Sequence, residues 1–122
     1  MEDRITKMEA FFAEKIAGCQ ARGSALLSDG RGDEANFEKV RGNIYDIFRT
    51  VLSAGVKNCQ GKPEATGHFF AQRLEQIPES WASALARAEA HGDDAKAHLE
   101  QIKLDAVAEI RAAFAAIWEG AK

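Results

Sequence analysis

Apolar residues recur every three or four positions along almost the whole chain, and only three short breaks rich in glycine or proline interrupt them. This spacing places apolar side chains on one side of a helix, so it predicts helices. Period-two alternation, which would indicate strands, is nowhere sustained. The clearest row lies in a segment of about residues 34–60 and comprises Phe37, Val40, Ile44, Ile47, Val51 and Ala54.

The breaks lie at residues 29–32, 61–63 and 91–93, and they divide the chain into four predicted helical segments. Gly92 suits the left-handed residue that follows a helix, and Pro63 suits a first helical position because its missing N–H costs nothing there. Asp33 and Asp93 are placed to accept hydrogen bonds from the exposed N–H groups at the start of a helix. We therefore expect tight turns between consecutive helices.

Pro78 lies inside the third segment, yet the apolar row from Phe70 to Leu85 keeps its helical register through it. We favour one helix kinked near Pro78, which gives four helices of similar length and short connections. These features predict an all-α fold, an antiparallel up-down-up-down four-helix bundle that forms a single domain over residues 1–122. The alternative is three long helices plus a short one.

Composition narrows the classes of function. The chain has 16 Lys and Arg against 19 Asp and Glu, so it lacks the basic excess that binds nucleic acid. No stretch approaches the ~18 apolar residues that a membrane span requires, and the charged N-terminus does not resemble a secretory signal. We expect a cytoplasmic protein with neither nucleic-acid nor membrane partners.

Two cysteines, Cys19 and Cys59, raise the question of a disulfide. If the first two helices form an antiparallel hairpin that turns near Gly30, Cys19 lies opposite about Gly42 and Cys59 lies near the far end. The axial offset is about 25 Å, far beyond the ~7 Å that a disulfide allows. We expect two free thiols.

No spacing of residues compels a particular chemistry. The di-metal E-x-x-H pair, the H-E-x-x-H motif and the glycine-rich phosphate loops are missing from the sequence. His91, His98, Asp93 and Asp94 gather near one turn and are weak candidates for a divalent cation, although turn and cap roles account for them as well. We therefore predict no catalytic residue, no metal site and no cofactor.

Glycines in the first two helices indicate where a crevice could form. Gly18 and Gly42 cost stability inside helices, and they would let the two backbones approach closely or leave a hollow between them. We predict that a crevice, if present, is lined by Ile16, Gly18, Cys19, Gly42 and Ile44.

The pairs Phe11–Phe12 and Phe69–Phe70 suggest an exposed apolar surface, because adjacent residues on a helix point about 100° apart. With Trp118 near the same end, Phe11 and Phe69 would form an interface for a protein partner or a homodimer. We accordingly expect a non-catalytic protein-interaction module. The alternative is a small-ligand- or metal-binding bundle with a possible enzymatic role.

Overall fold

The computed structural model describes residues 3–119 and contains only helices in this range, which confirms the predicted all-α fold. Five are α-helices, and a short π-helical segment, η1, continues the last of them. The elements are α1 (Arg4–Ser28), α2 (Gly32–Asn58), α3 (Pro63–Gln76), α4 (Glu79–Ala90), α5 (Asp94–Phe114) and η1 (Ala115–Glu119).

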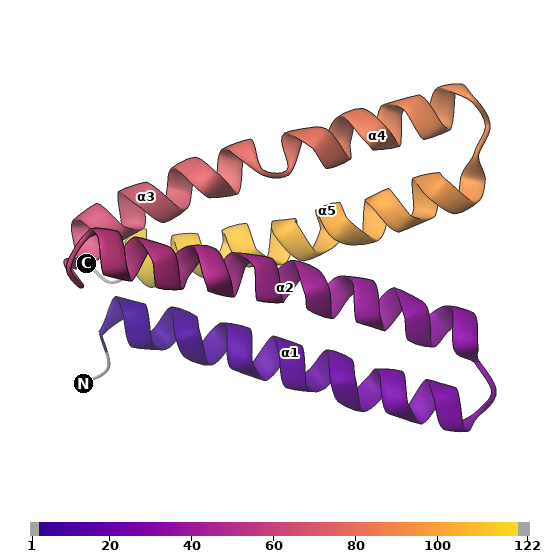
Figure 1. Ribbon diagram of the computed structural model, residues 1–122, viewed down its shortest axis with the longest axis horizontal. Helices are drawn as coiled ribbons and strands as arrows, with labels where there is room; N and C mark the ends of the chain where they lie inside the picture. The colour runs from indigo at the N-terminus through magenta and orange to yellow at the C-terminus, as the bar shows by residue number, and fades with distance from the viewer. Residues whose placement is uncertain (1–2, 120–122) are drawn as a thin grey trace.

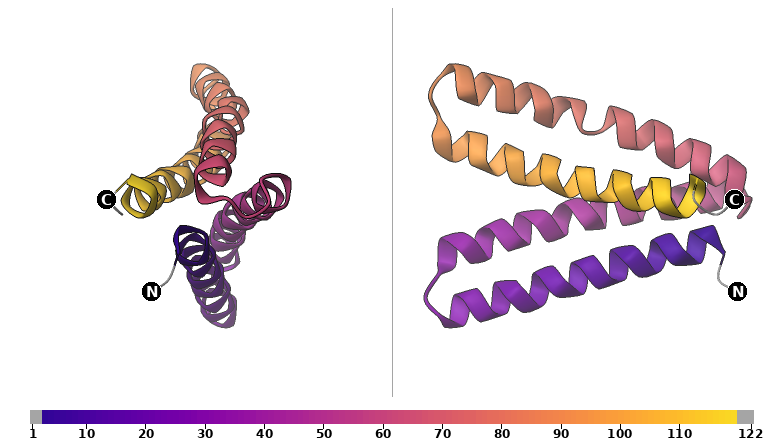
Figure 2. Two further views of the ribbon diagram at one scale, coloured as in Figure 1. Left: turned by 90° about the vertical axis from the view of Figure 1, so that its left-hand side faces the viewer. Right: turned by 180° about the vertical axis from the view of Figure 1, so that it is seen from behind.

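The chain reverses direction at each of three turns (Figure 1). Helices α1 and α2 form the first hairpin. Helices α3 and α4 lie end to end and run antiparallel to α5, and the three together form the second hairpin. Helix α2 contacts α1, α3 and α5, whereas α1 touches α5 and η1 only slightly. The α1–α2 and α4–α5 turns lie at one end, and both chain termini lie at the other (Figures 1 and 2). The first end is called the tip end below.

The helix boundaries follow local chemistry, with one difference from the prediction. Asp93 caps α5, its carboxylate accepting a hydrogen bond from Lys96 N at 3.1 Å, and Pro63 begins α3, both as expected. The expectation for Asp33 is wrong, because α2 already begins at Gly32 and its N-cap residue, Arg31, makes no side-chain cap. Asp33 therefore lies within the first helical turn, where its negative charge interacts favourably with the positive end of the helix dipole.

Pro78 separates α3 from α4, and the two pieces lie end to end with the predicted bend between them. Ile77 and Pro78 keep helical φ and ψ angles, and the chain bends between α3 and α4 without reversing (Figure 1). Proline has no N–H to donate to the carbonyl of Leu74, four residues earlier. Arg111 of α5 donates to that carbonyl oxygen at 3.3 Å instead, so the second hairpin compensates for the bond that Pro78 removes.

The densest part of the core lies toward the end that holds the termini. Phe70 is fully buried, with ring centroids 6.1 Å from Phe12, 6.2 Å from Phe48 and 5.1 Å from Phe114. These edge and tilted contacts connect α3 to α1, α2 and α5. Toward the tip end, the residues between the helices are smaller or more polar, and this is the part of the molecule that offers candidate sites.

Candidate functional site

The α1–α2 hairpin has the register expected from the sequence. A Cβ atom at Gly42 would lie 3.3 Å from Cys19 Cβ, so these two residues face each other across the helix pair. About one turn further along α1, Gly23 lies against the backbone of Ala35. Small residues at these positions bring the two helices close together toward the tip end.

A groove of about 670 Å³ runs along the outer side of this helix pair and is open to solvent. It is called the α1–α2 groove below. The residues that line it come from both helices and from the start of α2. They are Ile16, Cys19, Gln20, Gly23, Ser24 and Leu27 of α1, and Gly32, Ala35, Asn36, Glu38, Lys39, Gly42, Asn43, Asp46 and Arg49 of α2.

Three of the five residues predicted for a crevice line this groove, namely Ile16, Cys19 and Gly42. Gly18 and Ile44 do not. The Arg22 guanidinium lies over Gly18, 3.2 Å from where a Cβ would be, and Ile44 is buried in the core with 3% of its surface exposed.

The groove combines a narrow apolar floor with polar sides. Leu27, at its tip end, is 65% exposed and is the more exposed of the two large hydrophobic residues on the described surface. Carboxamide and charged side chains, such as Gln20, Asn43 and Lys39, border the small residues of the floor. The arrangement offers shape and hydrogen-bonding groups, which suits binding more than bond-breaking chemistry.

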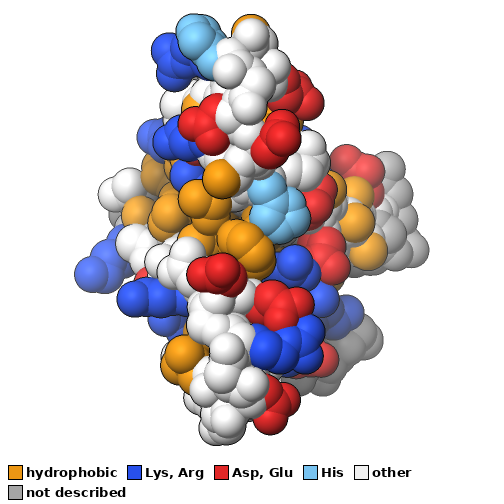
Figure 3. All heavy atoms as spheres, turned by 90° about the vertical axis from the view of Figure 1, so that its right-hand side faces the viewer, with side chains coloured by type: hydrophobic (Ala, Val, Ile, Leu, Met, Phe, Trp, Pro, Cys, Tyr) orange, Lys and Arg blue, Asp and Glu red, His pale blue; other side chains and the backbone are white. Residues whose placement is uncertain are grey.

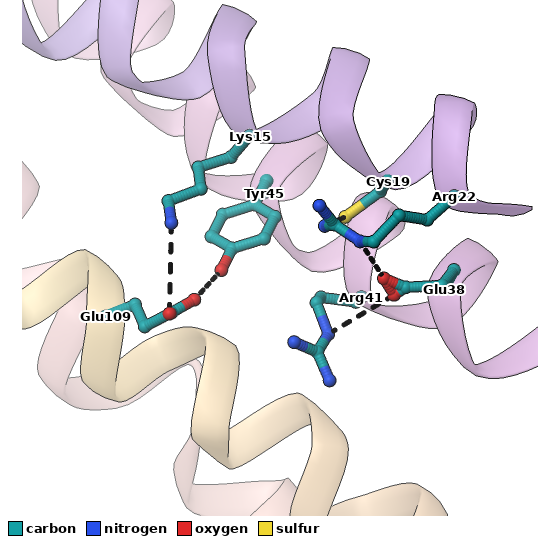
Figure 4. A network of polar contacts seen from close by, with 7 residues as sticks. All are labelled: Lys15, Cys19, Arg22, Glu38, Arg41, Tyr45 and Glu109. Atoms are coloured by element: carbon teal, nitrogen blue, oxygen red, sulfur yellow. Dashed lines mark hydrogen bonds and ion pairs between the residues drawn. The ribbon is translucent and has the colours of Figure 1, made fainter.

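A second polar feature lies between the α1–α2 hairpin and α5 (Figure 4), and it shares Cys19 and Glu38 with the lining of the groove. Glu38 of α2 is only 8% exposed and accepts a hydrogen bond from Arg22 Nε at 2.7 Å. The Nε atom of Arg41 lies 3.9 Å from the other carboxylate oxygen of Glu38. Arg22 Nη2 also lies 3.6 Å from Cys19 Sγ. Glu38 thus connects one arginine of α1 with one of α2.

A neighbouring set of contacts, made by Lys15, Tyr45 and Glu109, joins the two hairpins. The buried Tyr45 hydroxyl donates a hydrogen bond to Glu109 of α5, and Lys15 Nζ lies 3.8 Å from the other carboxylate oxygen (Figure 4). Burial is the main reason that the pKa of Tyr45 is raised above its ordinary value of 10, and the hydrogen bond to Glu109 raises it further. The phenol is therefore a stable, neutral donor at physiological pH.

Neither thiol is paired, in agreement with the sequence prediction. Burial raises the pKa of Cys19, and the negative charge of Glu38 adds to that effect. A thiol with a raised pKa is a poor nucleophile, since the thiolate is the reactive form. Arg22 and Arg41 act to lower the pKa of Cys19, but burial outweighs them, so Cys19 is a small packing residue beside Gly42.

The predicted interface residues Phe11, Phe69 and Trp118 are each half-buried and pack against other parts of the chain. Phe11 makes an edge contact with Tyr45 at 6.1 Å, Phe69 lies over Gly55, and Trp118 stacks on the Phe114 ring at 5.0 Å. The aromatic pairs found in residues 3–119 join none of the three to another. In the folded chain they hold helices together, and their part in association stays a prediction.

The weak metal candidates occupy the tip end but have other contacts. His91 Nδ1 lies 2.8 Å from the carbonyl oxygen of Arg87, Asp93 caps α5, and Asp94 is exposed in the first turn. The His98 ring meets the Phe37 ring edge-on at 4.6 Å. Residues 3–119 contain no group of three or more His, Cys, Asp or Glu side chains arranged to hold a metal ion.

The face at the tip end carries a hydrophobic surface. Figure 3 shows apolar side chains gathered in the middle of this face, with a histidine side chain against them and charged side chains around them.

No helix in residues 3–119 combines the length and the apolar character that a membrane crossing requires. The sequence matches no protein-family model, and comparisons with curated proteins and with solved structures find no significant match.

Proposed function

We propose that this chain is a non-catalytic protein-interaction module that receives a helix of its partner in the α1–α2 groove. The observation that carries the proposal is the open groove of about 670 Å³ between two antiparallel helices, with the exposed Leu27 at its end. A long, shallow depression along a helix pair is a common receiving surface for a third helix.

The dimensions agree with such an occupant. The lining residues of α2 extend from Gly32 to Arg49, which is about 25 Å at 1.5 Å per residue. A partner helix of about 17 residues would cover that length. The small residues Gly23, Ala35 and Gly42 along the floor would allow its backbone to approach closely.

The chemistry of the lining suggests the character of the partner helix. Ile16 and Leu27 would contact apolar side chains, whereas Gln20 and Asn43 would exchange hydrogen bonds at the sides. The expected partner is therefore an amphipathic helix with a narrow apolar stripe, from another protein or from a second copy of this chain. A cytoplasmic location belongs to the proposal and is supported by the unpaired thiols of Cys19 and Cys59.

Two tryptophan variants test the proposal. Ser24→Trp would fill the groove, whereas Ala21→Trp, three residues earlier, places the same ring on an exposed part of α1 outside the groove. Native mass spectrometry of each form, purified from its own cells, should show a second protein mass or a multiple of the chain mass for the wild type and for Ala21→Trp. The complex should be lost in Ser24→Trp, and circular dichroism should confirm that both variants fold.

Retention of the complex in Ser24→Trp, or a bare monomer in the wild type, would contradict a partner in this groove. A small-molecule site is the second candidate, because about 670 Å³ lies within the range of ligand pockets. In that case the wild type would carry a small extra mass that is absent from Ser24→Trp.

A further inference from the structure

The α1 side of the groove carries a narrow apolar stripe of its own. Four lining residues recur at steps of four, three and four positions, so they form one row along α1, and this row is called the α1 stripe below. They are Ile16, Gln20, Gly23 and Leu27. The two large apolar residues, Ile16 and Leu27, lie at its ends. The stripe therefore has the character expected of the partner helix.

The α1 stripe is complementary to itself when a second copy runs antiparallel to the first. In a two-fold contact between identical chains, a residue that covers a second residue is covered by it in return. If Leu27 lies over Ile16 of the second copy, the two-fold axis passes midway between positions 16 and 27. Gln20 then lies over Gly23 of the second copy, so the long polar side chain of each copy meets the glycine of the other.

The exposure of these residues fits this arrangement. Leu27 is 65% exposed, so a second copy can reach it, and Ile16 is half-buried in the groove. Gly23 also lines the groove and has no side chain that would hold a second backbone at a distance. Two such contacts of Leu27 with Ile16 form in each dimer, one at either end of the stripe.

The charges of the groove suit a copy of the same chain. The lining contains two acidic residues, Glu38 and Asp46, and two basic residues, Lys39 and Arg49, so it is neutral although the whole chain carries a formal charge of −3. A neutral surface does not repel its own copy. Glu38 pairs with Arg22, and Asp46 pairs with Arg49. Of the charged lining residues, Lys39 alone forms no ion pair within residues 3–119.

Lys39 would find a neutral acceptor on the second copy. Because Gly42 faces Cys19, Lys39 of α2 lies level with about position 22 of α1, which is also the level of the two-fold axis. It therefore lies within about one turn of Ser24 of the second copy. The Ser24 hydroxyl belongs to the groove lining and can accept a hydrogen bond from Lys39 Nζ.

We propose that the helix received by the α1–α2 groove is α1 of a second copy of this chain, in an antiparallel two-fold dimer in which Leu27 of each copy covers Ile16 of the other. The inference rests on the function proposed for the groove and names its occupant.

The size of the overlap sets the strength of the dimer. The parts of α1 that overlap run from about position 15 to position 28, a length of about 20 Å. Two helices side by side are about 20 Å wide, so each copy contributes roughly 400 Å². Interfaces of this size belong to weak, reversible complexes, so we expect a Kd between about 10 µM and about 1 mM.

Sedimentation equilibrium of the purified chain over this range of concentration tests the dimer. Leu27→Gln and Ile47→Gln form a matched pair, because each removes one of the two exposed large hydrophobic residues and only Leu27 lines the groove. The Kd should rise at least ~10-fold in Leu27→Gln, since two apolar contacts are lost per dimer, and stay unchanged in Ile47→Gln. Circular dichroism checks that each variant folds.

Single cysteines test the register in a chain that carries Cys19→Ala and Cys59→Ser. Oxidation of a mixture of Ile16→Cys and Leu27→Cys chains should give a cross-linked dimer, because the two positions lie against each other. Either variant alone should give none, since like positions lie about 16 Å apart along the axis, beyond the ~7 Å that a disulfide allows.

A chain that stays monomeric at about 1 mM, an equal loss of affinity in Leu27→Gln and Ile47→Gln, or cross-links within either variant alone would overturn the inference. The function proposed for the groove is judged separately. A complex with a different protein that Ser24→Trp removes would support the groove as a receiving site and exclude the second copy as its occupant. A dimer that survives Ser24→Trp would refute both.

Discussion

Gly67 of α3 provides a sharp test of how the C-terminal segment packs. The Trp118 indole of η1 lies on the Gly67 backbone and donates a hydrogen bond from Nε1 to the carbonyl oxygen of Pro63 at 3.1 Å. A methyl group at position 67 would lie 2.7 Å from Trp118 Cδ1 and 2.8 Å from Cε2, closer than non-bonded carbon atoms allow. Gly67→Ala should therefore expel the indole from this site.

The expected cost follows from what Trp118 loses. The hydrogen bond to Pro63 contributes about 1 kcal/mol, the stacking on Phe114 about 1 kcal/mol, and partial burial of the ring about 1–2 kcal/mol. Alanine gains up to ~1 kcal/mol over glycine in a helix interior. We expect a net loss of about 2–3 kcal/mol in the free energy of unfolding of Gly67→Ala.

A double-mutant cycle separates the clash from the intrinsic helix preference. Urea unfolding, followed by circular dichroism at 222 nm, would be measured for the wild type, Gly67→Ala, Trp118→Ala and the double variant. In the Trp118→Ala background the clash is gone, so Gly67→Ala should stabilise the chain by up to ~1 kcal/mol. A stabilising effect of Gly67→Ala while Trp118 is present would refute the reasoning.

Two further predictions concern the polar contacts. The pKa of Tyr45 is raised above 10 in the folded chain, so below pH 10 the phenol is protonated in both the folded and the unfolded state. Above pH 10 the unfolded state ionises first, and the free energy of unfolding therefore falls as the pH rises. Urea unfolding between about pH 9 and pH 11 should show a steeper loss for the wild type than for Tyr45→Phe, and equal slopes would contradict the role given to Tyr45 and Glu109. Asp93→Ala removes the hydrogen bond from Lys96 N and should lower the free energy of unfolding by about 1 kcal/mol. Asp33→Ala should lower it by less than about 0.5 kcal/mol, because Asp33 does not cap α2. Equal losses would show that both residues cap helices.

The helices and the register of α1 against α2 could be predicted because both depend on residues that lie close together in the sequence. Apolar spacing defines the buried side of each helix, and the turns contain glycines with positive φ, such as Gly30 and Gly92. Once the position of the first turn is known, the rise per residue fixes which residues of α1 and α2 face each other. The contact between Cys19 and Gly42 follows from this arithmetic alone.

The same arithmetic could have found part of the polar network. With Cys19 opposite Gly42, Arg22 lies level with about residue 39, within reach of Glu38, so opposite charges meet across the hairpin. Glu38 also lies seven residues before Tyr45 and therefore on the same side of α2, which indicates that its carboxylate is buried. The ion pair of Arg22 and Glu38 was thus predictable from the sequence.

The contact of Tyr45 with Glu109 was not predictable in this way. The two residues are 64 positions apart and lie in different hairpins, so their meeting depends on how the hairpins pack. The division at Pro78 has a similar cause. The apolar register continues through Pro78, but proline cannot donate to the carbonyl of Leu74, and the replacement donor, Arg111, comes from α5.

Glycines inside the helices show how packing decides what a sequence feature means. A Cβ atom at Gly55 would lie 2.8 Å from Phe69 Cδ1, and the indole of Trp118 occupies the corresponding space at Gly67. At these positions a large ring fills the place of the missing side chain. One of the adjacent aromatic pairs that suggested exposed rings is accommodated in this way, since Phe69 packs on Gly55 of α2, whereas Phe11 of the other pair packs on the Tyr45 ring.

Gly23 differs from Gly18, Gly42, Gly55 and Gly67, the other glycines that lie beyond the first turn of a described helix. Arg22 lies 3.2 Å from the Cβ position of Gly18, and Cys19 lies 3.3 Å from that of Gly42, so these two positions are also filled. At Gly23 the nearest atoms are 3.8 Å away, an ordinary contact, and the residue lines the α1–α2 groove. A glycine in a helix costs up to ~1 kcal/mol relative to alanine, and the contacts of Gly23 with Ala35 and Glu38 are loose enough for an alanine methyl group. An occupant of the groove that approaches the backbone at Gly23 would account for the glycine, which is why the function is proposed for this side of the hairpin.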